Sequence, residues 1–282
     1  MSQDLPFDRR LRRIRRDRAA AGFAEADYLH RLMADELVER LDFVKRDFRR
    51  ALDLGCAGGH LTRRLRERGL DVTSCDSGAE FARAAGGVQA DEDRLPFADG
   101  AFDLVVSAGA LDSVNDLPGA LILIRRALRP DGLFLGAFAG AGSLPRLRRA
   151  MLAADEVEGG AAARVHPQID VRAAGDLLTR AGFALPVVDA QPVDVRFRSL
   201  MDLVRDLRTM GSTNILAARS RRPLGRPALA AAIADFDGGG DKTVERFEII
   251  HLLGWGPSPD QPRPAPRGSG TVSLAEALKR RS

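Results

Sequence analysis

Short apolar runs alternate with amphipathic stretches through the first half of the chain. The apolar runs have the length of buried strands, and the stretches between them carry apolar residues at helical spacing. The expected strands are 51–54, 71–75, 88–90, 102–107 and 133–139, and the expected helices are 60–68, 78–85 and 117–128. This alternation predicts an α/β fold built on a parallel, doubly wound sheet. The segment 129–132, Arg-Pro-Asp-Gly, predicts a turn before the last of these strands.

The pattern differs on both sides of this region. A basic helix and a second helix over 26–43 precede the first strand. Helices are expected after residue 140 at 144–158, 171–181, 199–208 and 227–236, with strands at 184–188 and 247–254. We therefore divide the chain into three parts: an N-terminal basic arm and helix (1–48), an α/β domain (49–256) with a helical insertion at about 197–240, and an irregular tail rich in Pro and Gly (257–282).

Charge changes this picture little. The chain of 282 residues has 43 basic side chains, all but three of them arginine, yet its formal net charge is only +4 because acids are interspersed with the bases. This balance indicates that the many arginines reflect a bias in amino-acid composition and not a nucleic-acid-binding surface, so we expect no nucleic-acid partner. The arginines before residue 19 predict a solvated helical arm, and docking to an acidic partner is the alternative.

Targeting signals and cysteine chemistry are not evident. No apolar run approaches the ~20 residues that a membrane span needs, and the first residues lack the apolar core of a secretory signal. Cys56 and Cys75 have neither disulfide nor zinc-site spacing. We therefore expect a soluble protein of a reducing, bacterial cytoplasm.

The most informative segment is Ala51–Gly59, where an apolar strand runs into a glycine-rich turn and then a helix. Such a turn can cradle an adenosine-bearing ligand against unpaired backbone amides. A dinucleotide fingerprint starting at Gly55 would need glycines where the chain has Ala57 and His60, so ordinary NAD binding is disfavoured. Ala57 also stands where such a loop usually has glycine, and its methyl group narrows the space.

Two acids follow the next strands. Asp76 lies 21 residues beyond Gly55, where a carboxylate can accept hydrogen bonds from both ribose hydroxyls, although a turn acid is the alternative. Asp91 follows the third strand and can accept from an adenine amine, with Leu95 and Phe97 as an apolar shelf. An acidic surface loop is the alternative there.

The segments LDLGCAGG, CDS, ADEDRLPF and FDLVVS resemble, in order and spacing, the class I S-adenosylmethionine-dependent methyltransferases. The resemblance implies a Rossmann-like sheet of seven strands, mostly parallel with an antiparallel last strand, and S-adenosylmethionine as cofactor. It places the methionine part of the cofactor at the glycine-rich turn, the ribose at Asp76 and the adenine at Asp91. The implied cofactor-binding residues are Asp53, Gly55, Cys56, Ala57, Gly59, Asp76, Ser77, Asp91, Glu92 and Ser107.

Segments along nearly the whole chain, among them Phe7-Asp8-Arg9, 114–121, 200–211 and Gly254-Trp255, resemble the bacterial relatives of respiratory complex I assembly factor 5. The mitochondrial member of that family hydroxylates an arginine of a complex I subunit, and the malonyl-carrier-protein methyltransferase of biotin synthesis is a neighbouring family. The family's Leu-His-Trp is replaced here by Leu111-Asp112-Ser113, so the substrate side is altered while the cofactor side is kept.

Methyl transfer mainly requires that donor and acceptor be held in line. No catalytic residue is assigned; Asp112 is the positional candidate for a general base, and a solvated surface acid is the alternative. Hydroxylation commonly uses iron on a His-x-Asp/Glu set, which none of the four histidines supplies, so no metal site is expected.

Three functional hypotheses follow, and the resembled family adds one alternative. The first is a methyltransferase acting on a protein or carrier-bound acceptor, linked through the resembled family to complex I assembly. The second is a non-catalytic assembly module that keeps the fold, and a protein arginine hydroxylase is a further alternative within the resembled family. The third is a nucleotide-dependent oxidoreductase.

Overall fold

The computed structural model describes residues 5–237 and 240–261. Two helices and a short 3₁₀ turn precede the sheet: α1 (Arg9–Ala20), η1 (Phe23–Glu25) and α2 (Tyr28–Asp42). The strands are β1 (Arg50–Leu54), β2 (Asp71–Asp76), β3 (Val88–Gln89), β4 (Phe102–Ala108), β5 (Leu128–Ala139), β6 (Ala184–Phe197) and β7 (Thr243–Trp255). The remaining helices are α3 (His60–Glu67), α4 (Ala79–Ala84), η2 (Leu111–Ser113), α5 (Leu117–Ala127), α6 (Pro145–Glu158), α7 (Val171–Arg180), α8 (Leu200–Thr209) and α9 (Arg226–Asp237).

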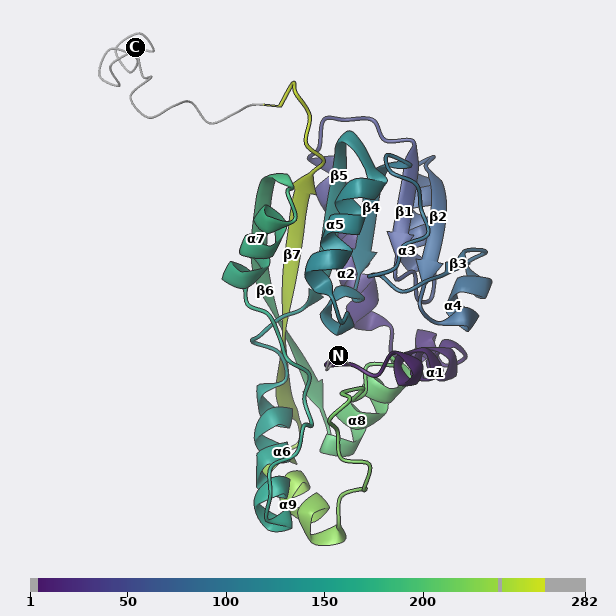
Figure 1. Ribbon diagram of the computed structural model, residues 1–282. Helices are drawn as coiled ribbons and strands as arrows, with labels where there is room; N and C mark the ends of the chain where they lie inside the picture. Colours follow the sequence, from purple (N-terminus) through teal and green to yellow (C-terminus); the bar gives the residue numbers. More distant parts are fainter. Residues whose placement is uncertain (1–4, 238–239, 262–282) are drawn as a thin grey trace, which may run out of the picture.

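The seven strands form one sheet in the order β3-β2-β1-β4-β5-β7-β6 (Figure 1). Strands β1 to β5 pair in parallel, whereas β7 is antiparallel to both β5 and β6. The predicted fold class is therefore confirmed, including the antiparallel last strand. Because parallel neighbours share a direction, the carboxyl ends of β1, β2 and β4 meet at one edge.

Helices cover both faces of the sheet, which explains why its central strands are apolar throughout. Leu104 and Val106 of β4 pack in the core that contains α2, whereas Val105 packs with α5 and α7 on the other face. Alternate residues of one strand thus enter two different cores. No helix in the described part of the chain is long and apolar enough to cross a membrane.

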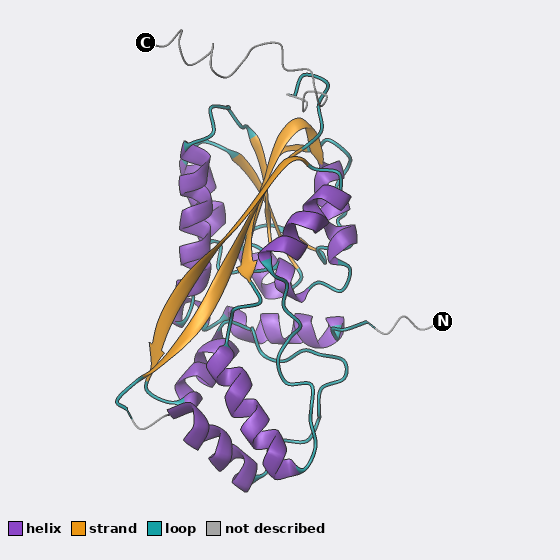
Figure 2. Cartoon of the chain, turned by 90° about the vertical axis from the view of Figure 1, so that its left-hand side faces the viewer, coloured by secondary structure: helices purple, strands orange, loops and turns teal. Residues whose placement is uncertain are grey.

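Strands β6 and β7 are longer than predicted and carry the sheet into a lower group of helices formed by α6, α8 and α9 (Figure 2). The sequence predicts β6 only over 184–188. Most of β6 is exposed, and among the described strands it pairs with β7 alone, so the strand lacks the apolar pattern that marks a buried strand. Pro192 is tolerated within it because β6 is an edge strand.

The predicted turn at 129–132 is wrong as an element boundary. Strand β5 begins at Leu128, which pairs with Phe102, and regular pairing resumes at Leu133. Asp131 has a φ of +62° between these two pairs. The turn-forming residues thus make an irregularity inside a strand. The predicted irregular tail, 257–282, lies outside the described residues from 262 onward.

Candidate functional site

The turn after β1 contains residues with positive φ angles, a backbone conformation that favours glycine. Gly55 and Gly59 have φ values of +84° and +73°. A Cβ atom on Gly55 would lie 2.3 Å from the Cβ of Ala110, so the turn packs directly against the segment that follows β4. The amides of Gly55 and Cys56 donate to the Cys75 carbonyl at 2.7 and 3.0 Å, which holds the turn on β2.

Ala57 keeps the left-handed backbone of this turn, with φ of +42°. Its amide donates to Oδ2 of Asp76 at 3.0 Å. Its methyl group belongs to a small apolar cluster with Ala19, Phe23 and Phe81. The alanine that replaces the expected glycine therefore packs against the segment containing α1 and η1.

Asp53 is buried at the end of β1 with one oxygen unpaired. Thr62 Oγ1 donates to Oδ2 at 2.6 Å, while Oδ1 has no hydrogen-bond partner among the described residues. Burial raises the pKa of Asp53 to about 7; the Thr62 hydrogen bond opposes this rise and the charge of Asp76 adds to it. An unpaired buried acceptor is costly, so this oxygen is suited to a donor from a ligand.

Asp76 ends β2 and is almost surrounded by donors. Its Oδ1 accepts from the Gly78 amide at 2.7 Å and from Arg16 Nε at 2.7 Å. Its Oδ2 accepts from the Ala57 amide and from Arg16 Nη2. Burial opposes ionisation of the carboxyl group, but the charge and hydrogen bonds of Arg16 lower the pKa of Asp76 below its ordinary value.

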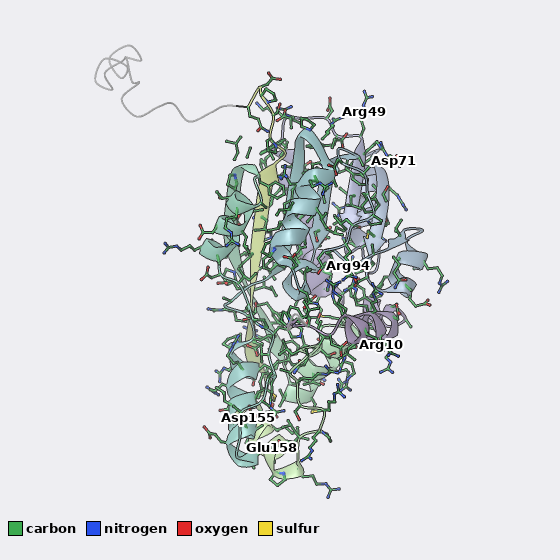
Figure 3. All side chains as sticks on the ribbon, viewed as in Figure 1. Arg10, Arg49, Asp71, Arg94, Asp155 and Glu158 are labelled. Carbon is green, nitrogen blue, oxygen red and sulfur yellow. The ribbon has the colours of Figure 1, made fainter. Side chains whose placement is uncertain are left out.

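The acidic loop after β3, residues 91–93, also forms ion pairs with arginines. Arginines of α1 reach each of its carboxylates: Arg9 and Arg13 contact Asp91, Arg12 contacts Glu92 and Arg9 contacts Asp93. Helix α1, which carries Arg10, and this loop, which carries Arg94, lie at the lower edge of the sheet in Figure 3. Arg49 and Asp71 mark the opposite edge.

The predicted solvated arm is therefore wrong. Arg12 and Arg16 are each only 7% exposed, α1 packs against α4, and Arg16 contacts Asp76 at the end of β2. Arg12 and Arg16 share one helical face because they are four residues apart. The spacing of these arginines is visible in the sequence. Their acidic partners are not, because they lie 60 to 80 residues away along the chain.

The remaining residues implied by the resemblance lie at the same edge. Ser77 Oγ is buried and has no hydrogen-bond partner among residues 5–237 and 240–261. Ser107 donates to the Leu54 carbonyl at 2.8 Å and so ties β4 to β1. Cys56 is buried, and burial raises the pKa of its thiol, so it serves as a small neutral side chain.

A cavity of about 380 Å³ lies between the sheet and the lower helices. Its apolar wall comes mainly from α2, α6, α8 and β7, through Leu29, Met33, Leu147, Leu200, Val204 and Ile249. Gly109, Asp112 and Ser113, which follow β4, line its upper end. This size and lining are typical of a small-molecule or side-chain pocket.

One carboxylate and two histidines line the cavity together with Arg12, Arg16 and Arg164. Burial raises the pKa of Asp112 to about 6, with the charge of Arg12 opposing the rise. Burial lowers the pKa of His30 to about 4, helped by Arg16, and lowers the pKa of His166 to about 4, helped by Arg12. Both histidines are therefore neutral at pH 7. Asp112 is half-buried and lines this cavity, whose wall is mostly apolar.

Sequence reasoning missed both histidines. His166 Nε2 accepts from the Ile215 amide at 3.1 Å, and His30 packs edge-on against Phe23. Nothing in their local sequence marks them, because their neighbours in the cavity come from distant segments. In the described part of the chain, no group of three or more His, Cys, Asp or Glu side chains is arranged to hold a metal ion.

The residues at this edge fit S-adenosylmethionine in chemical type. Asp53 Oδ1 and Ser77 Oγ are buried polar atoms that lack partners within the described residues, and the turn at Gly55 presents small side chains. Asp76 and Asp91 are the acids expected for ribose and adenine, although in this conformation both are paired with α1.

Comparison with known proteins defines the class. Residues 52–136 match the family model described as a methyltransferase domain. The fold is similar to that of the YcgJ protein from Bacillus subtilis, with a TM-score of 0.56 and 15% identity over 81% of this chain and all of that one. The chain therefore has the class I methyltransferase fold, and S-adenosylmethionine is the cofactor of that class.

Curated relatives define the family more narrowly. The chain is 35% identical to the arginine-hydroxylase NDUFAF5 of Danio rerio over 97% of this chain and 89% of the relative. It is 36% identical to the human NDUFAF5, over 97% and 83%. It is also 32% identical to the malonyl-[acyl-carrier protein] O-methyltransferase of Laribacter hongkongensis, over 86% and 87%. The chain belongs to the methyltransferase-fold family that contains NDUFAF5 and these carrier-protein methyltransferases.

Proposed function

We propose that this chain transfers a methyl group from S-adenosylmethionine to an acceptor that enters the cavity. The observation that carries the proposal is that the glycine-rich turn and the cavity lie on two sides of the same segment, the one that follows β4. Gly55 of the glycine-rich turn packs on Ala110, and the adjacent Gly109 lines the cavity. A donor on the turn and an acceptor in the cavity would thus meet at the carboxyl ends of β1 and β4, where open α/β sheets bind ligands.

Each cofactor residue has a distinct task in this proposal. Asp53 and Ser77 offer unpaired polar atoms to the methionine and ribose ends, Asp76 accepts from the ribose hydroxyls and Asp91 accepts from the adenine amine. Cys56, Ala57, Gly59 and Glu92 shape the surrounding surface. The cofactor supplies a methyl group bound to a positively charged sulfur, so the protein's contribution is mainly alignment and exclusion of water.

Asp112 is the proposed general base. When the acceptor's nucleophile forms its bond to the methyl carbon, the carbon–sulfur bond breaks and the nucleophile's proton must leave. Asp112 lines the cavity and has a pKa of about 6, so its carboxylate is ionised and basic enough to take that proton at pH 7.

The acceptor is proposed to be a side chain of a protein or a group on a carrier protein. The support comes from the relatives, whose names specify an arginine hydroxylase and a carrier-protein methyltransferase. A link to respiratory complex I and a cytoplasmic location belong to the same proposal. The free, buried Cys56 and Cys75 suit a reducing compartment.

Arginine hydroxylation is the second candidate, supported by identities of 35–36% to NDUFAF5 over 97% of the chain. The test is to incubate the chain with S-adenosylmethionine and an extract of cells that lack this protein. Mass spectrometry of the proteins and carrier proteins in the extract then identifies any modification. Methyl transfer adds one CH₂ unit to the acceptor and yields S-adenosylhomocysteine. Addition of one oxygen atom would instead establish hydroxylation, and cofactor binding without any modification would favour a non-catalytic assembly role.

A further inference from the structure

Helix α1 is held on the expected nucleoside-binding edge by a row of ion pairs. Three of its arginines pair with the loop after β3, and a fourth pairs with the end of β2. The pairs are Arg9 with Asp93, Arg12 with Glu92, Arg13 with Asp91 and Arg16 with Asp76. The pair of Arg16 and Asp76 is the most deeply buried, with side chains 8% and 0% exposed.

Arg16 uses the hydrogen-bonding capacity that the ribose would need. A carboxylate has about four acceptor positions. Asp76 already accepts from Gly78 and Arg16 at Oδ1 and from Ala57 and Arg16 at Oδ2. Two ribose hydroxyls can therefore bind Asp76 only if the Arg16 guanidinium leaves.

The segment after α1 closes the same edge by packing. Phe23 lies over the glycine-rich turn, such that a Cβ on Gly58 would meet its ring at 2.9 Å. The space left beside Asp53, Gly55 and Phe23 is about 20 Å³. That volume holds little more than a water molecule, so the turn has no room for a cofactor while η1 stays in place.

We infer that α1 is an internal competitor of the cofactor, because docking of its arginines and binding of the adenosine half of S-adenosylmethionine require the same carboxylates. The inference rests on the proposed function, since it takes Asp76 and Asp91 as the nucleoside ligands. Cofactor binding then includes the release of Arg16 from Asp76, and a buried charge pair is expensive to separate. A substitution on α1 that weakens its docking and leaves the carboxylates intact raises the apparent affinity for the cofactor.

The first test is calorimetric titration of S-adenosylmethionine into the wild-type chain and the Arg16→Gln variant. The variant is expected to bind with a Kd about tenfold lower, because less of the binding free energy is spent on undocking the helix. The matched control is Arg18→Gln, which removes the same charge from the same helix. Arg18 is exposed and has no ion pair within the described part of the chain, so its Kd should stay within about twofold of wild type.

The second measurement needs no substitution. Saturating the wild-type chain with S-adenosylmethionine should speed hydrogen exchange at the backbone amides of α1, since the helix loses its anchor. Slower exchange would show that α1 closes over the bound cofactor and would overturn the inference. Weaker or unchanged binding by Arg16→Gln would also overturn it, while leaving the proposed function intact. Absence of binding by both wild type and variant would overturn both.

Discussion

At the scale of single residues, Gly55 is where sequence and structure agree most fully. The sequence predicts a tight turn between a strand and a helix, and the structure has φ of +84° there. The reason for glycine is more than conformational, because Ala110 from another segment occupies the space of a Cβ atom. The sequence shows the conformational requirement, but the steric one depends on the tertiary fold.

This difference predicts unequal costs for two alanine substitutions. Gly69 has a similar φ of +82° with nothing near its missing Cβ, so Gly69→Ala should lower the free energy of unfolding by about 1 kcal/mol. Gly55→Ala adds a clash with Ala110 and should cost about 2–4 kcal/mol. Urea unfolding followed by circular dichroism measures both. Equal losses would mean that the contact with Ala110 relaxes freely.

The candidate acids were predictable and their partners were not. Asp76 and Asp91 follow strands in a recognisable order, which is a local signal. Arg12 and Arg16 bind acids that are distant in sequence, and an arginine-rich helix is typical of a solvated surface. The arginine-rich helix and the acidic motifs can each be interpreted alone, but neither motif shows that the two bind each other.

At the scale of elements, strand and helix positions in the central sheet follow the apolar pattern closely. Strand β1 spans Arg50–Leu54 where 51–54 was predicted, and α3 spans His60–Glu67 where 60–68 was predicted. The pattern fails for β6, whose side chains are mostly exposed along its length. Its extension depends on pairing with β7, which supplies backbone hydrogen bonds without an apolar signature.

Helix α7 offers a test of local capping. Asp170 accepts from the Ala173 amide at 2.7 Å at the start of this helix. Asp170→Ala should therefore lower the free energy of unfolding by about 1 kcal/mol. Asp176→Ala, at an exposed position inside the same helix, should change it by less than about 0.5 kcal/mol. Thermal unfolding compares the two, and equal effects would argue against the cap.

At the scale of the whole molecule, the sheet and the lower helices enclose the cavity together. The long strands β6 and β7 join the two parts, and α6, α8 and α9 complete the lower one (Figures 1 and 2). In the lower part, Asp155 and Glu158 of α6 are tied to Arg164 of the loop that lines the cavity. Because these segments are far apart in sequence, the cavity was not predictable from local patterns.

The cavity makes a prediction about pH. If Asp112 is the base, the rate of methyl transfer should rise as pH increases through about 6, because the ionised form is the active one. Asp112→Asn should abolish that rise and lower kcat about 100-fold. Calorimetry should show an unchanged Kd for S-adenosylmethionine, since Asp112 lies on the acceptor side. A variant that retains the wild-type rate and pH profile would remove Asp112 from the mechanism.

The edge formed by the glycine-rich turn and Asp76 is the proposed binding site of S-adenosylmethionine. Strand β2 offers a matched pair, because Asp76 ends it at that edge and Asp71 begins it, exposed, at the opposite one (Figure 3). The most direct measurement is calorimetric titration of S-adenosylmethionine into wild type, Asp76→Ala and Asp71→Ala. We predict binding by wild type and Asp71→Ala and a Kd at least about tenfold higher for Asp76→Ala. Equal binding by all three chains, or binding by none, would contradict the assignment of this edge, and of Asp76, to S-adenosylmethionine.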